Sequence, residues 1–173
     1  TLRALRDRDH VYRQTLDRAS ANRTMVLEKT DTLRRADLDA NLCVMVLMLQ
    51  SSNRENRESL RLFRDRGDVH GFTPPDGEQD AHSALKARVP NLDCYDLGDG
   101  RASWMIKDSM GNAMRLVRPI IVMDEGQRAV SDLAYATLYG FNPSLVLELT
   151  ATPRDVLPRP ATAKKPAQPG RLA

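Results

Sequence analysis

Residues 119–127 read PIIVMDEGQ, and residues 145–153 read LVLELTATP. Each stretch is a short apolar run that closes in acidic or hydroxyl-bearing residues, the pattern of a buried strand with polar side chains at its carboxyl end. Parallel strands need a crossover of a dozen or more residues, and residues 129–138 have a helical pattern of the right length to make one. The two runs therefore predict a pair of parallel buried strands whose carboxyl ends carry chemistry.

The acidic pair at the end of the first run, Asp124 and Glu125, suits metal and water chemistry. Ionised carboxylates are costly to bury unless they are paired or bound to a cation, and Mg²⁺ favours one or two carboxylates with water and phosphate oxygens. In such a pair the Asp holds the hydrated metal, while the Glu orients or deprotonates a water that attacks a phosphate. Adjacent acids are also common in solvated loops. The placement after an apolar run, and not the pair alone, favours a catalytic site.

The rest of the chain alternates helical and strand patterns. Residues 2–19 predict an amphipathic helix, residues 25–27 a short strand, and the eight apolar residues 42–49 a strand buried on both faces. Further helices are predicted at residues 81–89 and 110–117, a loop or helical turn at 31–40, and loops or irregular structure at 67–79 and 91–100. Strands that alternate with helices predict an α/β fold with a parallel sheet and flanking helices.

Composition and charge narrow the class of protein. The 173 residues suffice for one ordinary domain, and 41% hydrophobic with 28% charged residues is typical of a soluble cytoplasmic protein. No run approaches the roughly 18 apolar residues of a membrane span. After Pro153 the chain holds five basic residues and one acidic residue, a net +4, so residues 1–153 carry −1 of the total +3. Global positive charge is therefore no argument for nucleic-acid binding.

Several segments together resemble a known family. DEGQ at residues 124–127 resembles motif II, the Walker B box, of superfamily 2 helicases, and TATP at residues 150–153 resembles their motif III. Further stretches resemble DEAD/DEAH-box proteins of the type III restriction enzyme Res-subunit group, namely residues 42–56, 63–65, 89–93, 106–113 and 140–144. The resemblance implies that residues 1–156 are a partial RecA-like domain of the P-loop NTPase type, from an ATP-dependent DNA helicase or translocase.

The same resemblance implies roles for the residues at the two strand ends. Asp124 would hold Mg²⁺–ATP, through water, and Glu125 would activate the hydrolytic water. Gln127 stands where such proteins carry His or Gln, and would couple the nucleotide to motif III without an acid–base role. The coupling residues of motif III would be Thr150, Ala151 and Thr152. The implied partners are double-stranded DNA and a methyltransferase or specificity subunit, with no membrane.

The family pattern is incomplete in this chain. A Walker A loop needs a Gly-Lys dipeptide before Ser or Thr, so that backbone N–H groups and the lysine cradle the phosphates, and no Gly-Lys occurs in the sequence. The second motor domain is missing too.

Residues 157–173, rich in Pro and Ala and basic, are predicted to be a disordered tail. We therefore expect a fragment that does not hydrolyse ATP alone. The alternatives are a non-catalytic remnant that binds nucleic acid or a partner protein, and an unrelated parallel-sheet phosphohydrolase.

The end of the apolar run 42–49 is a second candidate contact with nucleic acid. Hydroxyl, amide and guanidinium groups there suit a DNA phosphate. The candidate residues are Gln50, Ser51, Ser52, Asn53 and Arg54. Ser52 or Asn53 also fits as the cap of a helix that runs to Asp65, and the two roles can coexist.

Overall fold

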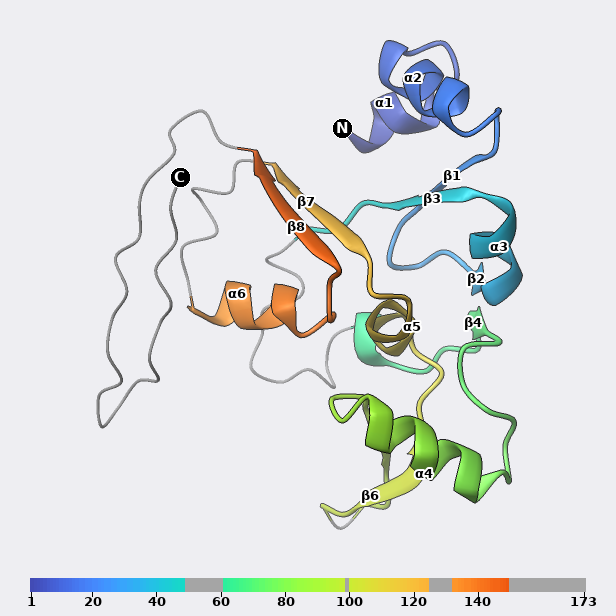
Figure 1. The fold of residues 1–173 in the computed structure, drawn as a ribbon, viewed down its shortest axis with the longest axis vertical. Coiled ribbons are helices and arrows are strands. Elements are labelled where there is room, and N and C mark those ends of the chain that lie inside the picture. The colour runs from blue at the N-terminus through green and yellow to red at the C-terminus, as the bar shows by residue number, and fades with distance from the viewer. Residues whose placement is uncertain (49–60, 99, 125–131, 150–173) are drawn as a thin grey trace.

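The computed structural model describes residues 1–48, 61–98, 100–124 and 132–149. The elements, in chain order, are α1 Leu2–Arg6, α2 Val11–Ala19, β1 Thr24–Leu27, β2 Leu33–Arg34, α3 Arg35–Ala40, β3 Leu42–Met45, the 3-10 turn η3 Arg61–Phe63, β4 Val69–His70, α4 Gln79–Arg88, β5 Cys94–Asp96, β6 Ala102–Ile106, α5 Met110–Val117, β7 Ile120–Asp124, α6 Asp132–Tyr139 and β8 Leu145–Leu149. Helix α5 lies near the middle, with α1 and α2 at one end and α4 and β6 at the other (Figure 1).

The architecture is α/β, with small sheets in place of one broad sheet. Within the described residues the strands form four two-stranded sheets, of which β1–β3, β2–β4 and β7–β8 are parallel and β5–β6 is antiparallel. The predicted α/β class with parallel pairing and flanking helices is confirmed at this level. A RecA-like sheet would join several strands into one layer, and that arrangement stays a prediction. No helix in the described part of the chain is long and apolar enough to cross a membrane.

The predicted helix over residues 2–19 is wrong as a single element, because the chain breaks between α1 and α2. The Oδ1 of Asp7 accepts a hydrogen bond from the backbone N–H of Asp9 at 3.0 Å. Asp7 itself has extended dihedrals, and His10 caps α2 by accepting the N–H of Tyr12 at 3.2 Å. Short polar side chains that bond to nearby backbone groups compete with the hydrogen bonds of a helix. This competition explains why the helix breaks between Arg6 and Val11 although the amphipathic pattern continues through residues 2–19.

Strand β3 is shorter and more exposed than predicted. The structure places a strand only at Leu42–Met45, pairs it in parallel with β1, and leaves Leu42 41% exposed with the next three residues half-buried. A strand buried on both faces needs cover on both sides, and among the described residues β3 pairs with β1 alone and has no fully buried residue. The prediction of a doubly buried strand over residues 42–49 is therefore wrong for residues 42–48, and residue 49 lies outside the described residues.

Two segments predicted to be loops or irregular contain strands. Residues 67–79 include β4, which pairs with β2, and residues 91–100 include β5, which pairs with β6. Both strands are two or three residues long, and their partners are distant or unpredicted. Strand formation depends on such neighbours more than on local preference, so a local pattern could not reveal them. The helices predicted at residues 81–89 and 110–117 are confirmed as α4 and α5.

The largest core cluster surrounds α5. Residues 110–115 of this helix are all buried, and Ser109 caps it by accepting the N–H of Asn112 at 3.2 Å. Phe63 of η3 packs against the helix at Gly111, and its ring stacks on that of Phe141 with centroids 6.1 Å apart. The buried members of this cluster are Leu27, Leu33, Leu62, Phe63, Val69, Met110, Ala113, Met114 and Phe141. Helix α5 is thus the packing centre from which β7 begins.

Cys43 on β3 offers a local test of this packing. Burial, together with the nearby carboxylate of Asp37, raises the pKa of the Cys43 thiol. Because the thiolate is the reactive form, we expect Cys43 to be alkylated with a higher pH midpoint than a cysteine in the unfolded chain. Asp37→Asn removes the charge but keeps an oxygen that can accept the N–H of Arg34, so the midpoint should fall. Residue-resolved mass spectrometry of alkylation against pH measures both values, and equal midpoints in the two proteins would contradict this assignment.

Candidate functional site

The candidate site lies at the carboxyl ends of β7 and β8. The two strands are parallel and in full register, from Ile120 opposite Leu145 to Asp124 opposite Leu149. The predicted pairing and its direction are confirmed. Both strands end at the same level, with Asp124 opposite Leu149, so the carboxyl ends of the pair lie at one edge of this small sheet.

Local geometry at the start of the strands sets this register. Arg118 ends α5 in the left-handed region with φ 53°, and Pro119 then leads into β7. The carbonyl oxygen of Pro119 accepts a hydrogen bond from the backbone N–H of Ser144 at 3.1 Å, just before β8 begins. This bond joins the two strands at their amino ends, and five successive residues of each strand then pair.

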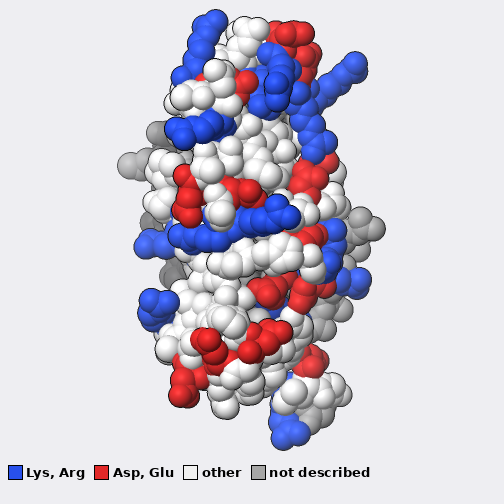
Figure 2. Space-filling model, turned by 90° about the vertical axis from the view of Figure 1, so that its right-hand side faces the viewer, with Lys and Arg blue, Asp and Glu red and all other residues white. Residues whose placement is uncertain are grey.

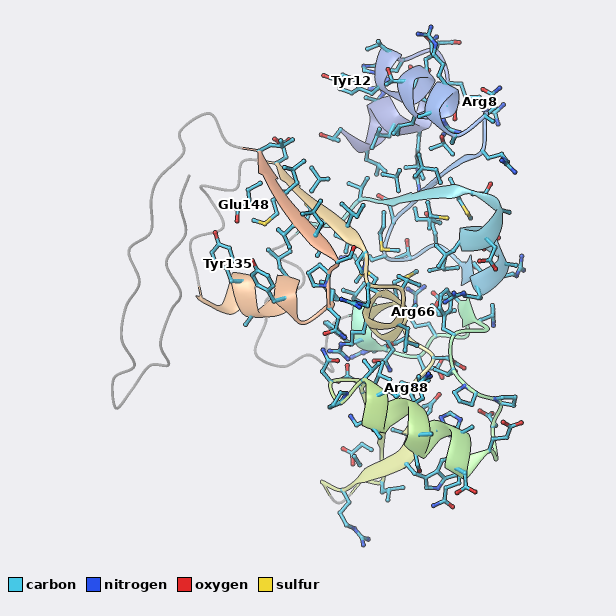
Figure 3. The ribbon with its side chains drawn as sticks, viewed as in Figure 1. Arg8, Tyr12, Arg66, Arg88, Tyr135 and Glu148 are labelled. Atoms are coloured by element: carbon cyan, nitrogen blue, oxygen red, sulfur yellow. The ribbon has the colours of Figure 1, made fainter. Side chains whose placement is uncertain are left out.

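The two faces of the β7–β8 pair differ. Ile121, Met123 and Val146 face the protein interior, with Met123 only 8% exposed. Figure 3 shows Glu148, on the same face, on the side of β8 that looks toward α6, from which Tyr135 extends toward the strands. The alternate residues of both strands face outward and are exposed. The prediction that both strands are buried is therefore wrong for one face, because nothing in the described structure covers it.

A buried polar network joins α5 to the loops before β5 and β8. Arg115 is 1% exposed, and its Nη1 lies 2.8 Å from the Oδ2 of Asp93. The same Nη1 donates to the Oδ1 of Asn112 at 2.9 Å, and the Nε of Arg115 donates to the carbonyl of Gly140 at 3.2 Å. The guanidinium also lies over the ring of Phe63, 5.2 Å from its centroid. One arginine thus holds three segments that are far apart in sequence.

A pair of amides completes this network at the surface. Asn91 donates to the Oδ1 of Asn142 at 2.9 Å, and Asn142 donates back to the Oδ1 of Asn91 at 3.0 Å. Asn91 also donates to the carbonyl of Gly140 at 3.0 Å. Asn142 has φ 54°, a left-handed conformation that Asn tolerates better than most residues. These contacts fix the turn between α6 and β8, and so the position of the β8 strand.

The sequence interpretation missed these positioning residues, although one signal pointed to them. Five stretches carry the family resemblance, and the structure brings members of four of them, residues 63–65, 89–93, 106–113 and 140–144, into this network or its packing against Phe63. Asn112, for example, donates to the carbonyls of Asp93 and Lys107 at 2.8 and 2.9 Å. These four segments, which are separate in the sequence, therefore form one connected unit in the structure.

Among the predicted site residues, Asp124 is the one that the structure describes. It is the last residue of β7 and is exposed. The other predicted residues lie outside the described residues, namely Glu125, Gln127, Thr150, Ala151, Thr152, Gln50, Ser51, Ser52, Asn53 and Arg54. Comparisons with family models, with curated proteins and with solved structures find no match to this chain.

The described residues fit one side of a Mg²⁺–ATP site. An exposed carboxylate at a strand end suits a hydrated Mg²⁺, which keeps several waters and takes few protein ligands. Within the described ranges no group of three or more His, Cys, Asp or Glu side chains is placed to hold a metal ion. Asp124 therefore fits a metal that is shared with water and phosphate, and not an all-protein cage. The phosphate side does not fit, because the sequence lacks the Gly-Lys of a phosphate loop.

Charges of both signs are interspersed on the surface drawn in Figure 2. Ion pairs of the described residues include Arg6 with Asp31 at 3.0 Å and Arg66 with Asp68 at 2.8 Å. A surface of alternating charge gives no broad field that would attract a polyanion. The face drawn in Figure 2 therefore offers no broad basic surface for a DNA backbone.

Proposed function

We propose that this chain is part of the first motor domain of an ATP-dependent DNA helicase or translocase, and that it does not hydrolyse ATP alone. The observation that supports this most is the parallel β7–β8 register, which ends the two strands at the same level, at Asp124 and Leu149. In open α/β sheets, ligands bind outside the carboxyl ends of parallel strands. Contact of residues 63–65, 89–93 and 140–144 with α5, whose first half lies in the stretch 106–113, adds support.

Each residue at this edge has one role in the proposal. Asp124 would hold the hydrated metal, and Glu125 would orient a water beside the phosphates. Gln127 with Thr150 and Thr152 transmits the nucleotide state to the surface that contacts double-stranded DNA. Mg²⁺, when bound, neutralises charge on the phosphates. No hydrolytic step is assigned to the chain alone, since it has no phosphate loop.

Nucleotide binding tests the proposal. We expect a fluorescent ATP analogue to bind the full chain weakly and only with Mg²⁺, because Asp124 contacts nucleotide through the metal. Asp124→Asn should abolish the binding that Mg²⁺ supports, while Asp96→Asn should leave this binding unchanged. Asp96 is a matched control, since it is also an exposed Asp at the last position of a strand. Fluorescence anisotropy with and without Mg²⁺ measures the binding.

Two outcomes would count against the proposal. Equal Mg²⁺-dependent binding by the wild-type chain and by Asp124→Asn would remove the metal role of Asp124. Steady ATP hydrolysis by the wild-type chain that is abolished by Glu125→Gln would show a complete ATPase, and would overturn the claim that the chain is inactive alone.

A further inference from the structure

The outward face of β7 and β8 is an apolar surface without cover in the described structure. Its five apolar side chains come from alternate positions of both strands, which the register sets side by side. Their exposed fractions are large: Ile120 66%, Val122 57%, Leu145 55%, Leu147 48% and Leu149 49%. We call these five residues the outer β7–β8 face. A contiguous exposed surface of aliphatic side chains is uncommon in soluble proteins and marks sites of association.

The two ends of this face carry opposite charge. Exposed Arg118 precedes β7 at the amino end, and exposed Asp124 closes β7 at the carboxyl end. When two copies of such a face meet with their strands antiparallel, the Arg118 end of each copy lies over the Asp124 end of the other. A parallel arrangement would instead place like charges together. The face is therefore complementary to itself in one orientation, which is the condition for a two-fold interface.

The area of the face limits the strength of such an interface. An apolar patch of this kind offers about 400 Å² per copy, so two copies would bury on the order of 800 Å². Stable complexes bury about 1,200 Å² or more, and smaller interfaces are transient. The face therefore suits a weak dimer that forms only at high concentration.

We infer that the outer β7–β8 face binds the same face of a second copy of this chain, with the two strand pairs antiparallel. Aliphatic side chains from both faces interdigitate between the two sheets, as in other packed sheets. Arg118 and Asp124 set the orientation at the two ends. The dimer is weak, because the area it buries is smaller than that of stable complexes.

Sedimentation equilibrium of the full chain, with its thiols kept reduced, tests this inference. Over a range of about 5 to 500 µM, the average mass should rise from the 19.4 kDa monomer toward twice that value. Val122→Lys places a charge in the centre of the interface and should raise the dissociation constant about tenfold or more. Val11→Lys is the matched control, because Val11 is also an exposed valine, at 61%, but lies on α2. It should leave the dissociation constant unchanged.

Charge reversal tests the orientation without touching the apolar residues. Arg118→Asp and Asp124→Arg should each weaken the dimer several-fold, and the double variant should restore it, because the pairs re-form in reverse. A chain that stays monomeric at the highest concentration would overturn the inference. So would association that Val11→Lys weakens as much as Val122→Lys, or assembly beyond the dimer, which would indicate open-ended contacts.

Discussion

Replacing Arg115 by Ala is expected to lower the free energy of unfolding by about 3 kcal/mol. The side chain is 1% exposed, so its removal leaves a cavity beside Phe63, takes the cation from Asp93 and removes one of the two donors to the carbonyl of Gly140. A partly buried carboxylate without its cation is costly, and the loss of one member of a buried ion pair is worse than the loss of both. Urea unfolding followed by circular dichroism measures the change.

Two comparisons separate burial from charge in this result. Arg6→Ala removes an ion pair with Asp31 in which both side chains are over a third exposed, and should cost no more than about 0.5 kcal/mol. Arg115→Lys keeps the charge but lacks the planar guanidinium with its several donors, so it cannot reach Asp93, Asn112 and Gly140 together. Its loss of unfolding free energy should be about half of that caused by Arg115→Ala. If Arg115→Ala costs as little as Arg6→Ala, the network does not hold α5 to its neighbouring loops.

Elements that are encoded locally could be predicted from the sequence. Helix α5 has its predicted bounds, because Ser109 supplies a cap and Arg118 with Pro119 ends the helix. Strand β8 coincides with its apolar run at residues 145–149, and β7, Ile120–Asp124, lies one residue later than its run at residues 119–123. Strand β5 could not be predicted, because it depends on β6 as its partner. The break after α1 depends on one side-chain bond of Asp7, which a periodic pattern does not reveal.

The candidate site was predictable in part for the same reason. That two strand ends meet follows from parallel pairing of the two apolar runs, and the structure has this pairing. The role of Arg115 was not predictable, because a charged residue in a helical pattern is usually exposed, and its burial requires Asp93 and Gly140 from distant segments. The exposure of Val122 was missed because an apolar run indicates burial but not how many faces are covered.

Gly111→Ala is expected to lower the free energy of unfolding by about 2 to 3 kcal/mol. Ala is the better helix former, and this change alone would stabilise a helix by about 1 kcal/mol. The opposite sign is expected here because a Cβ at position 111 would lie 2.4 Å from the Cδ1 and 2.6 Å from the Cε1 of Phe63. That ring is confined by Phe141 on one side and by the guanidinium of Arg115 on another, so it cannot move aside freely.

A second substitution decides whether Phe63 causes this cost. Phe63→Leu removes the planar ring and leaves a smaller side chain that can rotate away from α5. In that background, Gly111→Ala should cost less than half of what it costs in the wild-type chain, a coupling that a double-mutant cycle measures directly. An equal cost in both backgrounds would place the strain elsewhere, at the carbonyl of Leu62, which lies 3.3 Å from the added Cβ. The absence of any cost would mean that η3 does not pack against α5 at the distance that the structure gives, and the register of β7, which follows α5, would then lack its support.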